Sequence, residues 1–122
     1  MTEPIAINET ARLIASDKVE GTRVYNREGE RLGSVRNFMV DKRSGRVEYA
    51  VLEFGGILGI GNEYYPLPWD MLTYDEGQGG YVIDLDKSRL EGAPRYRERD
   101  PLWDEVYGRQ VYGYYGLPYP LL

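Results

Sequence analysis

The chain has 122 residues, with 15 Lys and Arg against 20 Asp and Glu, and therefore a formal net charge of −5. It contains no Cys and no His, which excludes disulfides, thiolate metal sites and catalytic triads built on His. The acidic excess lies in residues 62–122 and no basic block occurs, so nucleic acid is not an expected partner. This length predicts one compact domain with a tail.

Composition and the first residues also bear on location and fold class. No apolar run approaches the ~20 residues that a membrane-spanning helix needs. Residues 1–10 are polar, are expected to be flexible, and lack the pattern of a signal peptide. We therefore expect no membrane span and a cytoplasmic protein. The 15 Gly and 12 Tyr predict a turn-rich β domain.

The first predicted elements are two strands joined by a tight turn. Residues 11–15 are a short lead-in strand or turn, and residues 22–25 are β-branched and aromatic, as is typical of a strand. The turn that follows ends at Gly29, which is free to take a positive φ. Residues 31–41 have irregular apolar spacing, which predicts a long, bent strand with a bulge.

The strongest strand of the sequence is 46–54, which follows a turn at 42–45. Its two faces are both apolar at the centre, so we expect it to be covered on both sides or closed into a barrel. Residues 63–69 are extended and contain Pro66 and Pro68, which indicates an edge strand or a strand that leaves the sheet.

A hairpin and then a change of composition complete the chain. Residues 72–74 and 81–85 flank a Gly-rich turn, and residues 87–92 form a short helical turn. Residues 95–99 are a charged linker, after which Asp100 and Pro101 predict the start of a helix over 101–112. An apolar, Pro-kinked tail follows. The apolar positions at helical spacing are Leu102, Trp103, Val106, Tyr107 and Val111.

Five or six short strands with Gly-rich turns are typical of a small β-barrel. Residues 13–94 resemble the PRC-barrel family through the order and spacing of several segments. These are Gly-Thr-Arg-Val-Tyr-Asn-Arg-Glu-Gly-Glu-Arg-Leu-Gly-Ser-Val at 21–35, Phe-Met-Val-Asp at 38–41, Gly-Arg-Val at 45–47, Gly-Gly-Ile-Leu-Gly-Ile-Gly at 55–61, Pro-Leu-Pro-Trp at 66–69, Tyr-Val-Ile-Asp-Leu at 81–85 and Ala-Pro at 93–94.

That family includes the cytoplasmic domain of the photosynthetic reaction-centre H subunit, the C-terminal domain of the ribosome maturation factor RimM and small stand-alone proteins. The resemblance implies a compact β-barrel over residues 11–94 that acts as an adaptor. Composition separately predicts a flexible N-terminus over 1–10 and a helix with a Tyr/Pro-rich tail over 95–122. The sequence has neither the membrane helix of the first relative nor the N-terminal domain of the second. The expectation therefore extends to the fold and the adaptor role of a stand-alone member, and to neither quinone chemistry nor ribosome binding.

The Gly-rich segment 55–61 has two interpretations. It lacks the Lys and Ser or Thr of a phosphate-binding loop and the spacing of a dinucleotide fingerprint, so a Gly-rich hairpin that caps the barrel is favoured. The alternative leaves Ile57, Leu58 and Ile60 exposed as a self-association patch.

No arrangement of carboxylates predicts catalysis or a metal. Asp84 and Asp86 share one strand face but lack the glycine and the distal Glu of a calcium loop, so we expect them to be solvated. A further aromatic group either fills the ends of a barrel or stacks a planar ligand; its members are Tyr64, Tyr65, Trp69 and Tyr74. No catalytic residue, metal ligand or cofactor-binding residue is expected.

The densest functional signal is the aromatic C-terminal segment, which is too short to form a core of its own. Its side chains dock on their own barrel, on a second copy of the chain or on another protein. The candidate interaction residues of this segment are Trp103, Tyr107, Tyr112, Tyr114, Tyr115 and Tyr119.

The sequence therefore predicts a non-enzymatic, protein-binding adaptor that forms a homodimer through its tail and Gly-rich segment. Two alternatives remain open, a barrel that binds a small molecule or ion and a peripheral component of a membrane complex. The negative net charge argues against anionic lipid surfaces.

Overall fold

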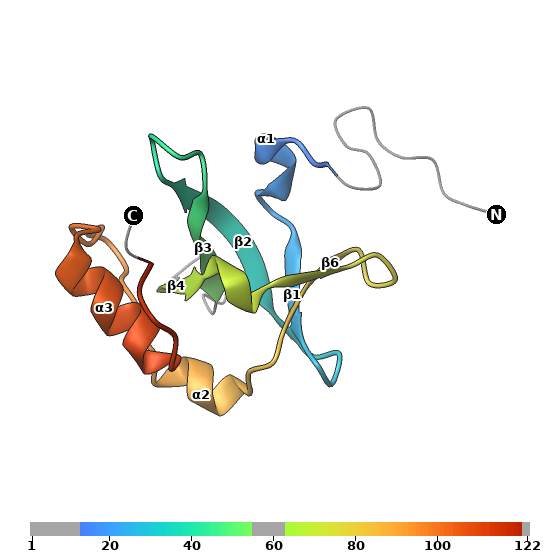
Figure 1. The fold of residues 1–122 in the computed structure, drawn as a ribbon. Coiled ribbons are helices and arrows are strands. Elements are labelled where there is room, and N and C mark those ends of the chain that lie inside the picture. Colours follow the sequence, from blue (N-terminus) through green and yellow to red (C-terminus); the bar gives the residue numbers. More distant parts are fainter. Residues whose placement is uncertain (1–12, 55–62, 121–122) are drawn as a thin grey trace.

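The computed structural model describes residues 13–54 and 63–120 (Figure 1). As predicted, this part of the chain is mostly β, with a short helix near the C-terminus. The elements in order are α1 (Ser16–Val19), β1 (Arg23–Asn26), β2 (Arg31–Val40), β3 (Val47–Phe54), β4 (Glu63–Pro68), the 3-10 turn η2 (Trp69–Met71), β5 (Thr73–Asp75), β6 (Gly80–Ile83), α2 (Lys87–Glu91) and α3 (Glu105–Tyr114).

The strands form one sheet in the order β4-β3-β2-β1-β6-β5. Every neighbouring pair is antiparallel except β1 and β6, which are parallel. The turn between β1 and β2 has Gly29 at φ +83°, as predicted. The buried Asn26 side chain completes that turn, because its carbonyl oxygen accepts from the N–H groups of Glu28 and Glu30.

Strand β2 is bent at the predicted bulge. Its register with β3 shifts between Val35 and Asn37, so that Arg36 is the extra residue. The backbones approach most closely at Gly33, where an added Cβ would lie 2.2 Å from the carbonyl oxygen of Glu53. Only glycine fits this crossing of β2 and β3.

Strand β3 is covered on both faces, as its sequence predicted. Leu52 belongs to the main core, which it shares with Val24, Leu32 and Leu67. On the opposite face Tyr49 packs into a second cluster with residues of α3. The strand therefore joins two apolar layers that the sequence alone did not separate.

The sheet differs from the closed barrel that the sequence predicted, since no described pairing joins β4 to β5. The outer edge of β4 is occupied by the linker, because Tyr64 and Tyr96 exchange backbone hydrogen bonds of 2.9 and 3.0 Å. Pro66 and Pro68 have the same orientation as Tyr64 and offer no N–H to a further strand. Strand β5 has only three residues, too few for a long ladder.

The predicted start of the C-terminal helix was wrong. The N-cap is Asp104 rather than Asp100, and its carboxylate accepts a 2.9 Å hydrogen bond from the N–H of Tyr107. Trp103 precedes the cap with φ +56°, a left-handed backbone that cannot continue a helix. Leu102 and Val106, expected on the buried side, are 87% and 77% exposed.

No helix in residues 13–54 and 63–120 is long and apolar enough to cross a membrane.

Candidate functional site

Aromatic rings hold α3 against the sheet. The ring of Trp103 contacts Tyr49 of β3, Tyr96 of the linker and Tyr107 of α3, with centroid distances of 5.2, 6.0 and 5.7 Å. Tyr96 in turn lies 5.3 Å from Tyr64 of β4. Edge-on and tilted pairs of this kind are the favoured geometries for aromatic side chains. We call the whole set, defined as Tyr49, Tyr64, Tyr96, Trp103, Tyr107, Tyr112 and Tyr119, the aromatic seam.

The seam continues through Tyr112, which lies 5.6 Å from Tyr49 and 5.4 Å from Tyr119. The hydroxyl of Tyr112 donates a 2.6 Å hydrogen bond to the backbone carbonyl of Glu48. Burial raises the pKa of Tyr112 above its usual value and raises the pKa of Tyr107 to about 12. These rings are therefore part of the chain's own packing.

The tail folds back along α3, as the ribbon in Figure 1 shows. The turn is made at Gly116, which has φ +73°, and the N–H of Leu117 donates to the carbonyl of Tyr112. Tyr119 then lies over Gly108, where an added Cβ would come within 2.2 Å of the ring. Gly108 thus admits the tail at a point where any side chain would collide with it.

The linker before α3 is attached to β4 rather than free. The carboxylate of Glu63 accepts hydrogen bonds from the Tyr65 hydroxyl at 2.8 Å and from the Arg97 Nε at 2.9 Å. It also lies 3.2 Å from the Arg95 guanidinium. The Tyr65 hydrogen bond, followed by that of Arg97, lowers the pKa of Glu63 below its usual value.

The far end of α3 is joined to α2. The hydroxyl of Tyr114 donates a 2.6 Å hydrogen bond to the carbonyl of Arg89, and the Arg89 guanidinium donates to the carbonyl of Tyr114. Tyr115 packs against the main core, at a centroid distance of 5.1 Å from Tyr114. Both ends of α3 are therefore anchored within the chain.

The outer face of α3 carries the unpartnered apolar surface. Val106 lies in its first turn and Leu102 lies four residues earlier, and both are exposed. Beside Val106, the Arg109 guanidinium forms an ion pair of 3.1 Å with the Glu105 carboxylate. Gly113 completes this face, and an added Cβ there would meet nothing within 4 Å. We use the name α3 outer face for the exposed helix residues Glu105, Val106, Arg109 and Gly113 together with the exposed Leu102, which precedes the helix.

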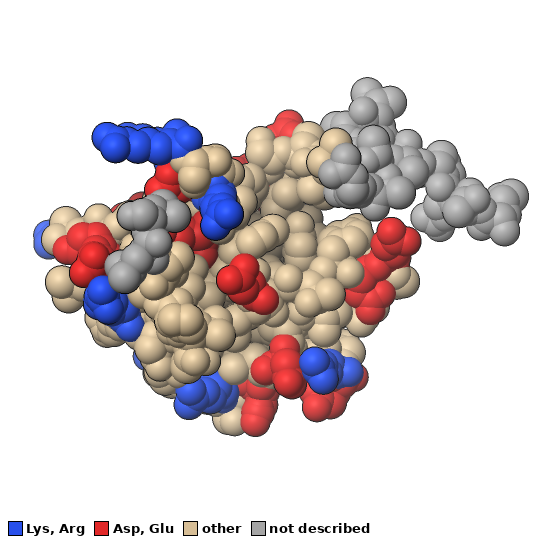
Figure 2. All heavy atoms as spheres, viewed as in Figure 1, with Lys and Arg blue, Asp and Glu red and all other residues tan. Residues whose placement is uncertain are grey.

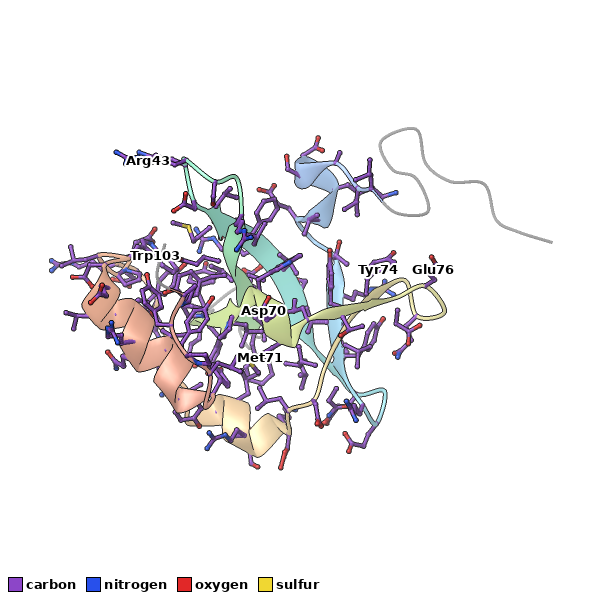
Figure 3. The ribbon with its side chains drawn as sticks, viewed as in Figure 1. Arg43, Asp70, Met71, Tyr74, Glu76 and Trp103 are labelled. Atoms are coloured by element: carbon purple, nitrogen blue, oxygen red, sulfur yellow. The ribbon has the colours of Figure 1, made fainter. Side chains whose placement is uncertain are left out.

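A second feature is an open hollow of about 580 Å³ beside the β5–β6 hairpin. Figure 3 labels Asp70 and Met71 of η2 and Tyr74 and Glu76 of the hairpin, which contribute to its wall. The remaining residues of the wall are Arg27, Thr73, Asp75, Val82 and Asp84.

Two of the carboxylates in this hollow already have partners within the chain. The Asp84 carboxylate lies 3.7 Å from the Arg27 guanidinium, and Asp75 accepts hydrogen bonds from the N–H groups of its own turn. Asp70 and Glu76 remain to give the hollow a negative character. Among the described residues no group of three or more carboxylates could hold a metal ion.

A family model for the PRC-barrel domain matches residues 12–90, which is more than half of the chain. The chain belongs to the PRC-barrel family. A comparison with curated proteins gives no match. The matched range covers the sheet and most of α2, whereas Trp103, α3 and the tail lie beyond it.

The predicted interaction residues of this PRC-barrel protein have separate environments. Trp103, Tyr107, Tyr112 and Tyr119 lie in the aromatic seam, and Tyr114 and Tyr115 lie near α2 and the main core. All six of these side chains pack against other residues of their own chain, in two different places. The other three, Ile57, Leu58 and Ile60, lie outside the described residues.

Sequence reasoning missed two groups of residues. Tyr49 and Tyr96 complete the aromatic seam. Each lies between small or charged residues in an extended segment, a pattern that does not indicate a contact with the C-terminal segment. Leu102 and Val106 were recognised as apolar but were assigned to the buried side. Asp104, three residues before Tyr107, was the signal that would have moved the helix start.

Proposed function

We propose that this PRC-barrel protein is a non-enzymatic protein-binding module that docks its partner on the α3 outer face. One observation carries the proposal. Leu102 and Val106 are 87% and 77% exposed on a segment whose rings are packed inward. Exposing two large aliphatic side chains to water is unfavourable, and burying each contributes roughly 1.5–3 kcal/mol.

The backbone before α3 supports this assignment. Trp103 has φ +56°, a conformation that costs a residue other than glycine about 1 kcal/mol. The same turn directs the Trp103 ring into the aromatic seam and leaves Leu102 outside. Strain of this kind persists where the surrounding packing compensates for it, and it often marks a functional surface.

The assignment revises which residues of the C-terminal segment act as anchors. The aromatic side chains predicted to bind a partner stabilise α3 instead, and the aliphatic residues next to them take over that role. That the module is not an enzyme rests on the sequence, which contains no His and no Cys. Lys and Arg are scattered over the face that Figure 2 displays, without a continuous basic patch there, which argues against nucleic acid as the partner of that face.

An affinity capture from the native organism tests the proposal. The bait proteins are the unaltered chain, the double variant Leu102→Ser with Val106→Ser, and the control Val40→Ser. Val40 is also an exposed aliphatic residue, at 43%, and it ends β2. We expect the same proteins on the unaltered and control baits and their loss from the double variant. Equal retention on all three baits would contradict the proposal.

The hollow beside the β5–β6 hairpin favours a second candidate, a binding site for a small cation. Asp70 and Glu76 supply negative charge and Tyr74, 43% exposed, presents an aromatic ring. Thermal unfolding with a panel of amines and guanidinium compounds tests it, with Asp70→Asn as the matched variant. A rise in Tm that Asp70→Asn abolishes supports this candidate, and an unchanged Tm at millimolar concentrations rejects it.

A further inference from the structure

The α3 outer face is complementary to itself, and from this we infer that its partner is a second copy of the chain, bound with the two α3 helices antiparallel. This inference rests on the proposed function, which it makes specific. Exposure along α3 follows the helical period, because Glu105, Val106, Arg109 and Gly113 are exposed while Gly108, Val111 and Tyr112 are buried.

Charge complementarity determines the direction of the second helix. Glu105 and Arg109 are one turn apart on the same face. When two such helices run antiparallel about a twofold axis near Val106, the Glu105 of each copy approaches the Arg109 of the other. A parallel arrangement would place like charges opposite one another instead. A twofold contact is also the commonest way in which identical chains associate.

Shape complementarity agrees with this direction. In the antiparallel register the two Val106 side chains meet close to the axis. Each Leu102 then lies beside the second half of the other helix, the half that contains Gly113. An added Cβ at Gly113 meets nothing within 4 Å, so the second copy finds open space at that position. The contact therefore has an apolar centre, a charged pair on each side and room at its ends.

The contact is small, so the dimer is weak. Stable interfaces bury about 1,200–2,000 Å², more than one short helix from each copy supplies. We therefore expect dissociation in the range of ~10 µM to 1 mM, as is usual for transient contacts. Analytical ultracentrifugation over that range should show the average mass rising from 14.1 kDa toward twice that value.

Charge exchange between two variants tests the pairing itself. Glu105→Arg has two positive charges on this face, and Arg109→Glu has two negative charges. Each variant alone repels a second copy of itself, and we expect its self-association to weaken about tenfold or more. An equimolar mixture restores both opposite-charge pairs across the axis. We therefore expect the mixture to associate about as tightly as the unaltered chain.

Matched controls separate folding from association. Circular dichroism confirms that each variant retains α3, and Val40→Asp controls for adding an acidic group at an exposed aliphatic residue elsewhere. Val106→Asp should abolish association, whereas Val40→Asp should leave it unchanged.

Two results would overturn the inference. The first is an average mass of 14.1 kDa at every concentration up to about 1 mM. The second is a dimer that Val106→Asp leaves intact or that the charge mixture fails to restore. Neither result decides the proposed function, which depends on whether the Leu102 and Val106 double variant loses captured proteins.

Discussion

The two faces of the ten-residue helix α3 have opposite environments. The inner face is covered by rings, with Tyr112 between Tyr49 and Tyr119 and the Gly108 backbone beneath the returning tail. The outer face exposes Val106 next to an ion pair that water can reach. The comparison teaches that aromatic density in a short segment measures how firmly it docks on its own chain. The exposed aliphatic residues beside it are the ones that we propose to bind a partner.

Truncating one residue on each side of α3 should give the largest contrast. Tyr49 is 2% exposed and contacts both Trp103 and Tyr112, so Tyr49→Ala should lower the free energy of unfolding by about 3–5 kcal/mol. Val106→Ala, on the exposed side, should change it by less than about 0.5 kcal/mol. Urea unfolding of dilute protein measures both.

A large loss for Val106→Ala would mean that the outer face is packed within the single chain. A small loss for Tyr49→Ala would mean that the seam contributes little to holding α3. Either result would remove the distinction between the two faces.

The same substitution at two glycines of α3 sharpens the contrast. Gly113→Ala adds a methyl group in open space and improves helix propensity, so it should stabilise the protein by about 0.5–1 kcal/mol. Gly108→Ala has the same propensity gain but displaces the Tyr119 ring, a repacking that costs about 1–3 kcal/mol. Thermal unfolding should therefore shift in opposite directions for the two variants.

Tryptophan fluorescence supplies the check on Gly108→Ala, since loss of the tail alters the surroundings of Trp103 through Tyr112. Equal stabilisation by both substitutions would show that the tail does not rest on Gly108.

Two glutamates should respond to pH with opposite sign and the smallest effects. The pKa of Glu63 is lowered, first by the Tyr65 hydrogen bond, so its charge stabilises the fold above the usual pKa near 4.5. Burial, followed by the charge of Asp41, raises the pKa of Glu48, so its charge destabilises the fold at neutral pH. At pH 7 we expect Glu63→Gln to lower Tm and Glu48→Gln to raise it, each by about 1–3 °C.

Both differences should shrink as the pH falls, because the wild-type carboxylates then take up protons and resemble the amides. Glu48 regains its proton first, since its pKa is the higher of the two. Differences in Tm that persist unchanged at acidic pH would show that side-chain packing, not charge, causes them.

The strands and turns were predictable because local signals agreed with the global fold. Gly29 and Gly45 have the positive φ values that their turns required, and β3 has the double apolar pattern of a strand covered on both sides. Pro66 and Pro68 correctly placed β4 at an edge of the sheet.

The start of α3 could not be read from local signals because two of them compete. Asp100 with Pro101 and Asp104 are both good N-caps. The contact of Trp103 with Tyr49, which is distant in sequence, favours Asp104, because it accompanies a left-handed residue before the helix. The later start leaves Leu102 outside the helix. Val106 is helical with either start, but it is five residues from the buried Val111, a spacing that places the two side chains on different faces.

The candidate site was only partly predictable for a different reason. The periodicity of apolar residues indicates which side chains are buried, but it does not indicate whether the same chain or a partner buries them. The aromatic residues found that cover on β3 and β4 because Tyr49 and Tyr64 present rings there. The rings that meet are far apart in the sequence, so their complementarity exists only in the folded chain.

The two borders of the sheet set a limit on strand exchange between molecules. At one border of the sheet, Tyr96 already pairs with β4, and Pro66 and Pro68 offer no backbone N–H to a further strand. At the other border, β5 pairs only with β6 in the described part of the chain. A sheet with one usable border can be extended once and then stops. Extending the sheet beyond β4 would first require the backbone hydrogen bonds between Tyr64 and Tyr96 to break, and Pro66 and Pro68 would still offer no N–H to a new strand.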